Sequence, residues 1–177
     1  AEKAFALRPK HHGTLDTLFA LQSDSADWAG ARTTLSAKLH AKALPKDVAR
    51  RRDAVLSLAD AKVAHDAGDQ AAARASALEA NKLAPTLVPA AVLAARILIE
   101  EGAKRPATKI LKAAWATAPH PDLATAFAAL EPDEPAAARR KRFEQLAKVH
   151  PTHHETKMLL AELALTEEDF PTARREL

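Results

Sequence analysis

The side chains best suited to ligand or metal chemistry in this sequence are histidines, and they lie beside prolines. Six of the eight histidines, His11, His12, His120, His150, His153 and His154, lie near Pro9, Pro119, Pro121 or Pro151. Because proline does not continue a helix interior, we expect these histidines in water-exposed turns, where an imidazole caps a helix or is solvated. A metal site made of His150, His153 and His154 is the alternative, but their spacing is not that of a recognised ligand pair on one helix.

The remaining residues predict no catalytic machinery. Cysteine is absent, which excludes disulfides, zinc ribbons, thiol catalysis and iron–sulfur clusters. The spacing places no serine, histidine and acid together and no pair of catalytic carboxylates. Glu100–Glu101 and Glu167–Asp169 lie near expected helix ends, where solvated charge explains them. We therefore predict a protein that is not an enzyme and that has no cofactor and no metal.

Charge and hydropathy argue against nucleic acid or a bilayer as the partner of this chain. The formal net charge is +3. The basic runs Arg50–Arg52 and Arg139–Arg142 have apolar and acidic neighbours, which favours a solvated helix face over a phosphate-binding patch. The longest apolar run, Leu87–Ile99, is interrupted by Pro89 and Arg96 and falls short of the ~20 residues of a membrane span.

Composition and an internal repeat predict the fold. Helix-forming residues dominate the 177-residue chain, which has four glycines and no tyrosine. Gly68 and Gly102 are 34 residues apart, and so are Pro85 and Pro119. Three alanine pairs keep the same spacing: Ala61 and Ala95, Ala73 and Ala107, and Ala80 and Ala114. A period of 34 is that of tetratricopeptide (TPR) repeats.

Each repeated position has a physical role in a helix–turn–helix unit. The alanines let two antiparallel helices approach closely, and the glycine ends the first helix in a left-handed conformation. Asp69, just past Gly68, is placed to cap the next helix, and Pro85 closes the unit. We therefore predict an all-α protein, a TPR-type right-handed α-solenoid of antiparallel helix pairs. An ordinary helical bundle, which needs no fixed repeat, is the alternative.

The repeats divide the chain as one domain, residues 1–177. We expect a partial repeat at 1–11, containing Ala4 and Pro9, complete repeats at about 12–45, 48–85, 86–119 and 120–151, and a truncated repeat at 152–177. The 12–45 unit closes late, at Pro45, which predicts a second helix longer than usual. Both ends would then cut through repeats, so we expect a piece of a longer protein whose apolar ends favour self-association.

Three stretches resemble a known family. They are Leu18-Phe-Ala-Leu-Gln22 with Asp27-Trp-Ala-Gly-Ala31, then Leu83-Ala-Pro-Thr-Leu-Val-Pro-Ala-Ala91, and Ala114-Trp-Ala-Thr-Ala-Pro-His-Pro121. Together they resemble the C-terminal TPR region of the HemY family, membrane-anchored bacterial proteins associated with haem biosynthesis. An unrelated flavin-dependent oxidase shares that name, but the absence of Gly-x-Gly-x-x-Gly excludes it.

The resemblance implies a location and partners. The family carries two membrane helices ahead of its repeats, so it implies the bacterial inner membrane, with the TPR domain on the cytoplasmic side. It implies a non-catalytic protein–protein interaction scaffold whose partners include haem-pathway enzymes. A tetrapyrrole-binding or tetrapyrrole-handling protein is the alternative function. The resemblance supplies no catalytic residues.

Repeat geometry predicts a partner-binding groove. In TPR proteins the first helix of each repeat lines the concave surface. One stripe of that surface would carry Val55, Leu58, Lys62 and His65, and its counterpart in the next repeat Val92, Arg96 and Ile99. Lys62 and Arg96 are 34 residues apart, so we predict a two-cation clamp for a carboxylate on an acidic or C-terminal peptide. Alternatively, the two cations only cover apolar surface.

Overall fold

The computed structural model describes residues 11–177, and all regular structure in that range is helical. Ala4 and Pro9, expected in a partial repeat, lie outside the described residues. The chain divides into two compact units, residues 1–84 and 85–177. Unit 1 contains α2 (His12–Asp24), α3 (Trp28–His40), α4 (Lys46–Asp66) and α5 (Gln70–Leu83). Unit 2 contains α6 (Val88–Glu100), α7 (Lys104–Thr117), α8 (Pro121–Ala128), α9 (Ala136–Ala147), α10 (His154–Thr166) and α11 (Phe170–Glu176).

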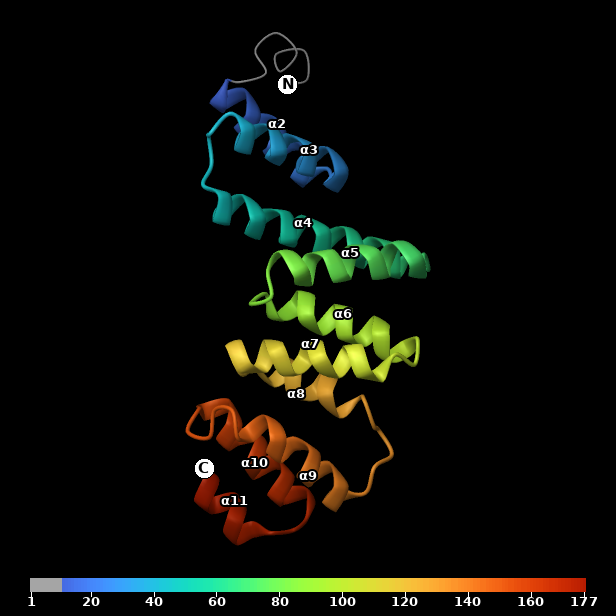
Figure 1. Ribbon diagram of the computed structural model, residues 1–177, viewed down its shortest axis with the longest axis vertical. Helices are drawn as coiled ribbons and strands as arrows, with labels where there is room; N and C mark the ends of the chain where they lie inside the picture. The colour runs from blue at the N-terminus through green and yellow to red at the C-terminus, as the bar shows by residue number, and fades with distance from the viewer. Residues whose placement is uncertain (1–10) are drawn as a thin grey trace. The chain divides into compact units, whose positions relative to one another are not determined.

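Consecutive helices form antiparallel pairs that short turns join. In unit 1, α2 packs on α3 and α4 on α5, and in unit 2 α6 packs on α7 and α10 on α11 (Figure 1). The alanines expected at the close contacts are buried: Ala61, Ala73, Ala80, Ala95, Ala107 and Ala114. A methyl group at these positions lets the paired helices approach, as larger side chains would not. The predicted all-α, TPR-type fold class is confirmed.

Five helices of the described residues end in the same left-handed turn. The residue with positive φ is Ala26, Lys42, Gly68, Gly102 or Glu168. At Gly68 the N–H donates to the carbonyl of His65 at 3.0 Å, and the following N–H of Asp69 donates to Ala64 at 2.9 Å. This bonding pattern is the Schellman motif, which satisfies carbonyls that a helix end would otherwise leave unpaired.

In four of these turns the next residue is the N-cap of the following helix, and in three of them its side chain caps that helix. Asp27, Asp69 and Asp169 accept hydrogen bonds from the backbone N–H three residues on, at 2.9, 3.0 and 3.1 Å. The fourth position is Ala103, which has no side-chain acceptor. The residue three positions after it is Pro106, which has no N–H to donate. The missing acceptor at Ala103 therefore matches a missing donor at Pro106.

Three of the six histidines beside prolines cap helices, one of the two roles predicted for them. His11, His120 and His153 are the N-caps of α2, α8 and α10, and the Nδ1 atom of each accepts from a backbone N–H at 3.1–3.3 Å. The Nε2 atom of His150 lies 2.9 Å from the carbonyl oxygen of Ala116. Among residues 11–177, no group of histidines, cysteines and carboxylates could hold a metal ion.

One expectation about helix length is wrong. The second helix of the 12–45 unit, α3, ends at His40, and the long helix is instead α4, with 21 residues. Helix α3 ends early because Lys42 adopts a left-handed conformation, with φ of 54°, and the sequence has no glycine there to indicate the turn. Pro45 follows as the N-cap of α4 and so begins a helix instead of closing one.

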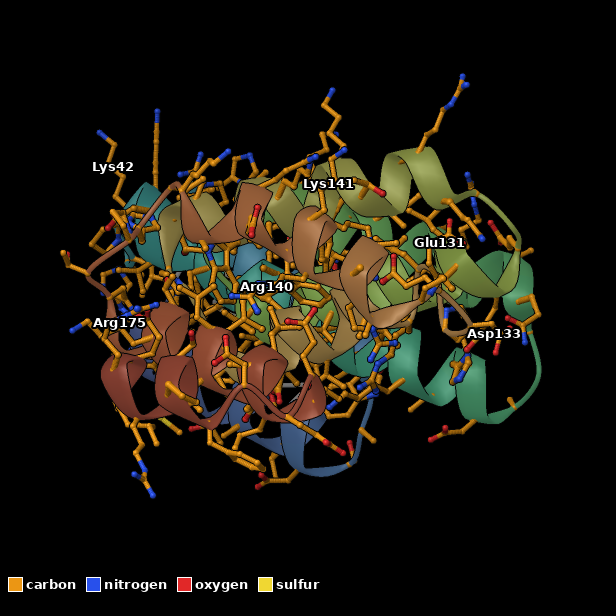
Figure 2. All side chains as sticks on the ribbon, turned by 90° about the horizontal axis from the view of Figure 1, so that it is seen from below. Lys42, Glu131, Asp133, Arg140, Lys141 and Arg175 are labelled. Atoms are coloured by element: carbon orange, nitrogen blue, oxygen red, sulfur yellow. The ribbon has the colours of Figure 1, made fainter. Side chains whose placement is uncertain are left out.

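Unit 2 contains a loop between α8 and α9 that an arginine holds closed. The Nε atom of Arg142 donates to both carboxylate oxygens of Glu134 at 3.0 Å, and Nη1 donates to the carbonyl of Phe127 at 2.5 Å. The rings of Phe127 and Phe143 meet edge to face at 5.1 Å. On α9, Arg140 pairs with Glu167 of the α10–α11 turn, whereas Lys141 is exposed (Figure 2).

Candidate protein-binding site

An apolar pocket of about 540 Å³ lies between α2, α3 and the first half of α4, all in unit 1. Its lining residues are Phe19 and Ser23 of α2, Trp28 of α3, and Asp47, Val48, Arg51, Arg52, Val55 and Leu56 of α4. Val48, Arg51, Arg52 and Val55 recur at helical spacing on one face of α4, which is why one helix supplies most of the wall. We call this the α2–α4 pocket.

The wall of the pocket is anchored in the core of unit 1. Phe19 and Trp28 are half-buried and pack against a buried cluster of Ala31, Leu35, Ala49 and Leu56. Two ion pairs hold the supporting helices together: Arg32 with Asp53 at 2.5 Å, joining α3 to α4, and Lys38 with Asp16 at 2.5 Å, joining α3 to α2. Packing and ion pairs therefore join the three helices that supply the lining residues.

The charged side chains of the pocket are mainly cationic. Arg51 and Arg52 are exposed, and neither forms an ion pair with a carboxylate of residues 11–177. The guanidinium of Arg52 lies 6.0 Å from the Phe19 ring centroid, within reach of a cation–π interaction. Asp47 is the one carboxylate among the lining residues. Nearby, the hydrogen bond and charge of Lys38 lower the pKa of Asp16, so that carboxylate stays ionised and neutralises Lys38.

Two polar atoms in the pocket wall lack a hydrogen-bond partner. They are the Trp28 indole nitrogen and the Ser23 hydroxyl oxygen, and both are buried. Buried polar atoms without partners are uncommon in folded proteins because each one forfeits its hydrogen bonds to water. Both atoms belong to residues that line the pocket, and elsewhere in unit 1, among residues 11–84, such atoms occur at Ser57 and His65.

The predicted groove residues of unit 1 divide into exposed and buried ones. Val55 is 49% exposed and lines the α2–α4 pocket, and Lys62 is exposed further along α4. His65 is half-buried, and its Nδ1 atom has no partner among the described residues. Leu58 is buried in the core, so it supports this surface instead of forming part of it.

The predicted residues of unit 2 divide in the same way. Arg96 is exposed on α6, Ile99 is half-buried, and Val92 is buried. The clamp between Lys62 and Arg96 stays a prediction from the 34-residue spacing.

Unit 2 also has a hollow, of about 310 Å³, lined by Trp115, Phe143, Met158 and Leu163. Charges of both signs lie at it, from Arg139, Glu155 and Glu162, so it shows no electrostatic preference. It is smaller than the α2–α4 pocket, and Trp115 is only 1% exposed. We therefore take the α2–α4 pocket as the candidate site.

Sequence reasoning found only one lining residue of this pocket, Val55. It assigned Arg50–Arg52 to a solvated face, and all three are exposed, but Arg51 and Arg52 also line this pocket. A signal was present, since Val48, Arg51, Arg52 and Val55 recur at the 3- and 4-residue spacing of a helix face. The contribution of Phe19 and Trp28 from other helices had no such signal.

Comparison with known proteins gives one informative relative. No protein-family model matches the chain. The chain is 29% identical over 159 residues to a protein described as "Probable magnetosome protein Mms48" of Magnetospirillum gryphiswaldense (strain DSM 6361 / JCM 21280 / NBRC 15271 / MSR-1). The match covers 90% of this chain and 35% of the relative, so the chain spans about a third of that protein's length. A solved structure titled "MamA RS-1 ArsTM double mutant" aligns with 93% of this chain and 89% of its own, at 17% identity and a TM-score of 0.41.

These findings correct two expectations. The resemblance to the HemY family was wrong, because the relative found is a probable magnetosome protein and nothing links the chain to HemY. The assignment to the bacterial inner membrane, with the TPR domain on the cytoplasmic side, depended on that resemblance and is withdrawn with it. Between residue 11 and the C-terminus, no helix has the length and hydropathy that crossing a bilayer requires.

Proposed function

We propose that this chain is a non-catalytic scaffold that holds a protein partner, with the α2–α4 pocket as its docking point. The observation that carries the proposal is the pairing of exposed apolar surface at Val55, 49% accessible, with unpaired guanidinium groups at Arg51 and Arg52. Surfaces that combine an apolar pocket with a charged rim are typical of protein interaction sites.

The fold supports the same proposal. Antiparallel helix pairs of the TPR type present the faces of successive helices to a ligand, and their stability comes from packing between neighbours. Nothing in the α2–α4 pocket resembles a nucleophile with its base, so the proposal assigns the chain no reaction.

The source of the partner is proposed from the comparison. Similarity to a probable magnetosome protein supports a partner among the proteins of that organelle. The chain spans 35% of the relative's length, so the proposal concerns the partner of this segment. Haem-pathway enzymes and the tetrapyrrole-binding alternative depended on the HemY resemblance, and no observation on the structure supports either.

The test is a pull-down from purified magnetosomes with the 177-residue chain as bait. The bait is compared with an Arg51→Glu/Arg52→Glu variant and with Arg50→Glu, which makes the same charge change on the same helix outside the pocket. A protein retained by the native chain and by Arg50→Glu but lost from the double variant supports the proposal. Identical partner sets from all three baits contradict it.

The predicted clamp belongs to the same proposal. A Lys62→Glu/Arg96→Glu variant in the same pull-down tests it directly, because both residues are exposed and the change leaves the core intact. Loss of the partner from this variant supports the clamp, and unchanged retention contradicts it.

A further inference from the structure

We propose that the α2–α4 pocket recognises an acidic peptide segment of its partner, in which a bulky apolar side chain lies between carboxylates. The inference rests on the proposed function, because it names the chemistry of the ligand that the docking point takes. Three features of the pocket support it: its volume and apolar lining, its unpaired arginines, and the pairing of neighbouring cations with carboxylates of their own.

The size and lining of the pocket select the central side chain. Phe19, Trp28, Val48, Val55 and Leu56 supply aromatic and branched apolar surface. A volume of about 540 Å³ falls in the ~300–1,000 Å³ range of small-ligand pockets, so a large apolar side chain fits. In protein complexes, a few such anchors in pockets contribute most of the binding free energy. The occupant is therefore expected to insert a phenylalanine, leucine or similar residue.

The positive charge at the rim of the pocket favours acidic residues on either side of the apolar side chain of the bound peptide. Arg51 and Arg52 face one lining carboxylate, Asp47, which leaves an excess of positive charge. Two cations of the neighbouring helix α3, Arg32 and Lys38, are already paired with Asp53 and Asp16. Guanidinium groups bind carboxylates through two parallel hydrogen bonds, so glutamate or aspartate beside the apolar anchor completes the pairing.

Other occupants fit the observations less well. A nucleic acid would need a larger patch of one sign, and here a carboxylate lies among the lining residues and the chain carries only +3. A basic peptide would meet Arg51 and Arg52 at the rim, where like charges repel. A second copy of this chain is tested below as a separate outcome.

The experiment measures fluorescence anisotropy of dye-labelled synthetic peptides titrated with the full 177-residue chain. The main probe contains a phenylalanine flanked on both sides by glutamates. One comparison peptide replaces the phenylalanine with alanine, and another replaces the glutamates with lysines. Each titration is repeated at low and high ionic strength, because salt shortens the reach of exposed charges from ~10 Å at 0.1 M to ~3 Å at 1 M.

We expect the glutamate–phenylalanine peptide to bind. Either comparison peptide should bind at least about tenfold more weakly, which corresponds to a difference of about 1.4 kcal/mol in binding free energy. The Arg51→Glu/Arg52→Glu variant is expected to lose roughly tenfold in affinity, because it removes two guanidinium contacts to the peptide carboxylates. Arg50→Glu, the matched control, is expected to change the affinity less than about twofold.

The outcomes separate the inference from the proposed function. If the lysine-flanked peptide binds as tightly as the glutamate-flanked one, the pocket is a peptide site but the acidic assignment is wrong. If no peptide binds in any salt, and pull-downs are insensitive to the double variant, both fail. Sedimentation that shows self-association of the native chain, abolished by Arg51→Glu/Arg52→Glu, assigns the pocket to a second copy and overturns the inference.

Discussion

The guanidinium of Arg142 forms a forked ion pair with the carboxylate of Glu134, eight residues before it, at 3.0 Å from Nε to each oxygen. The same guanidinium lies 4.6 Å and 5.0 Å from the ring centroids of Phe127 and Phe143. Its side chain is 18% exposed and that of Glu134 is 11% exposed, so the pair is largely removed from water. One side chain thus joins the end of α8, the loop and the middle of α9.

Replacing Arg142 with methionine should destabilise unit 2. The change removes the hydrogen bonds that Arg142 donates to the Glu134 carboxylate and the Phe127 carbonyl, which costs about 2–3 kcal/mol. Glu134 then keeps the ion pair with Arg139 at 3.6 Å, and the Phe127 carbonyl keeps the N–H of Leu130 at 3.3 Å. Chemical denaturation followed by circular dichroism gives the free energy of unfolding. Lys141→Met, on the exposed side of α9 (Figure 2), is the control and should change it by less than about 0.5 kcal/mol. Equal effects of the two variants would contradict the role of the fork.

The same pair should make stability depend on pH. The hydrogen bond from Arg142, and then its charge, lower the pKa of Glu134 against the opposing effect of burial. Because the folded-state pKa lies below the unfolded one, the stabilisation is complete above the ordinary carboxyl pKa of about 4.3 and is lost as the pH falls through the lower value. Denaturation at a series of pH values should show this loss, and Glu134→Gln should reduce the slope. An unchanged slope would contradict the assignment.

Glycine should stabilise the turns where the chain uses another residue in a left-handed conformation. Ala26 and Glu168 both have φ of 58°, which costs about 1 kcal/mol for any residue with a Cβ atom. Ala26→Gly and Glu168→Gly are therefore expected to raise the free energy of unfolding by up to that amount. Gly68→Ala should lower it by about as much, because no atom crowds a Cβ there and only the backbone conformation opposes the change.

A helix-interior alanine provides the control for these variants. Ala75 is exposed within α5, where glycine costs about 0.5–1 kcal/mol relative to alanine. Ala75→Gly should therefore destabilise the protein, the opposite sign to Ala26→Gly for the same chemical change. Thermal unfolding of both variants measures their changes in stability. If Ala26→Gly and Ala75→Gly changed stability in the same direction, the left-handed turn would not explain the effect at Ala26.

An aspartate at the N-cap of α7 should stabilise the helix only when residue 106 has a backbone N–H to donate. Ala103→Asp alone is expected to have little effect, because Pro106 lacks the N–H that the other capping aspartates use. With Pro106→Ala present, Ala103→Asp should add about 1 kcal/mol to the free energy of unfolding. A double-mutant cycle measures this coupling, and additive effects would refute it.

The predictable part of the fold depended on residues that have one dominant role. Gly68 and Gly102 revealed the repeat because glycine is the usual residue of a left-handed turn. Ala26 and Glu168 occupy the same turn without that signal, so the first and last described pairs were harder to place. The end of α3 was misplaced for the same reason, since Lys42 adopts a left-handed conformation without a glycine.

The candidate site was less predictable than the fold. Helical spacing along α4 indicated a face that contains Val55, but Leu58 on that stripe turns into the core. The facing wall comes from Phe19 and Trp28 on neighbouring helices, and their approach depends on how those helices cross. A period read along one helix specifies which residues share a face, whereas a pocket also needs the distance to the next helix.

The two tryptophans, Trp28 in unit 1 and Trp115 in unit 2, give each unit its own intrinsic fluorophore, and the chain has no tyrosine to add background emission. Their surroundings differ, since Trp115 is 1% exposed in the core and Trp28 is half-buried at the α2–α4 pocket. Emission from Trp115 should accordingly lie at shorter wavelength than emission from Trp28. A Trp28→Phe variant isolates the signal of unit 2, and its difference from the native spectrum reports unit 1 without any attached label.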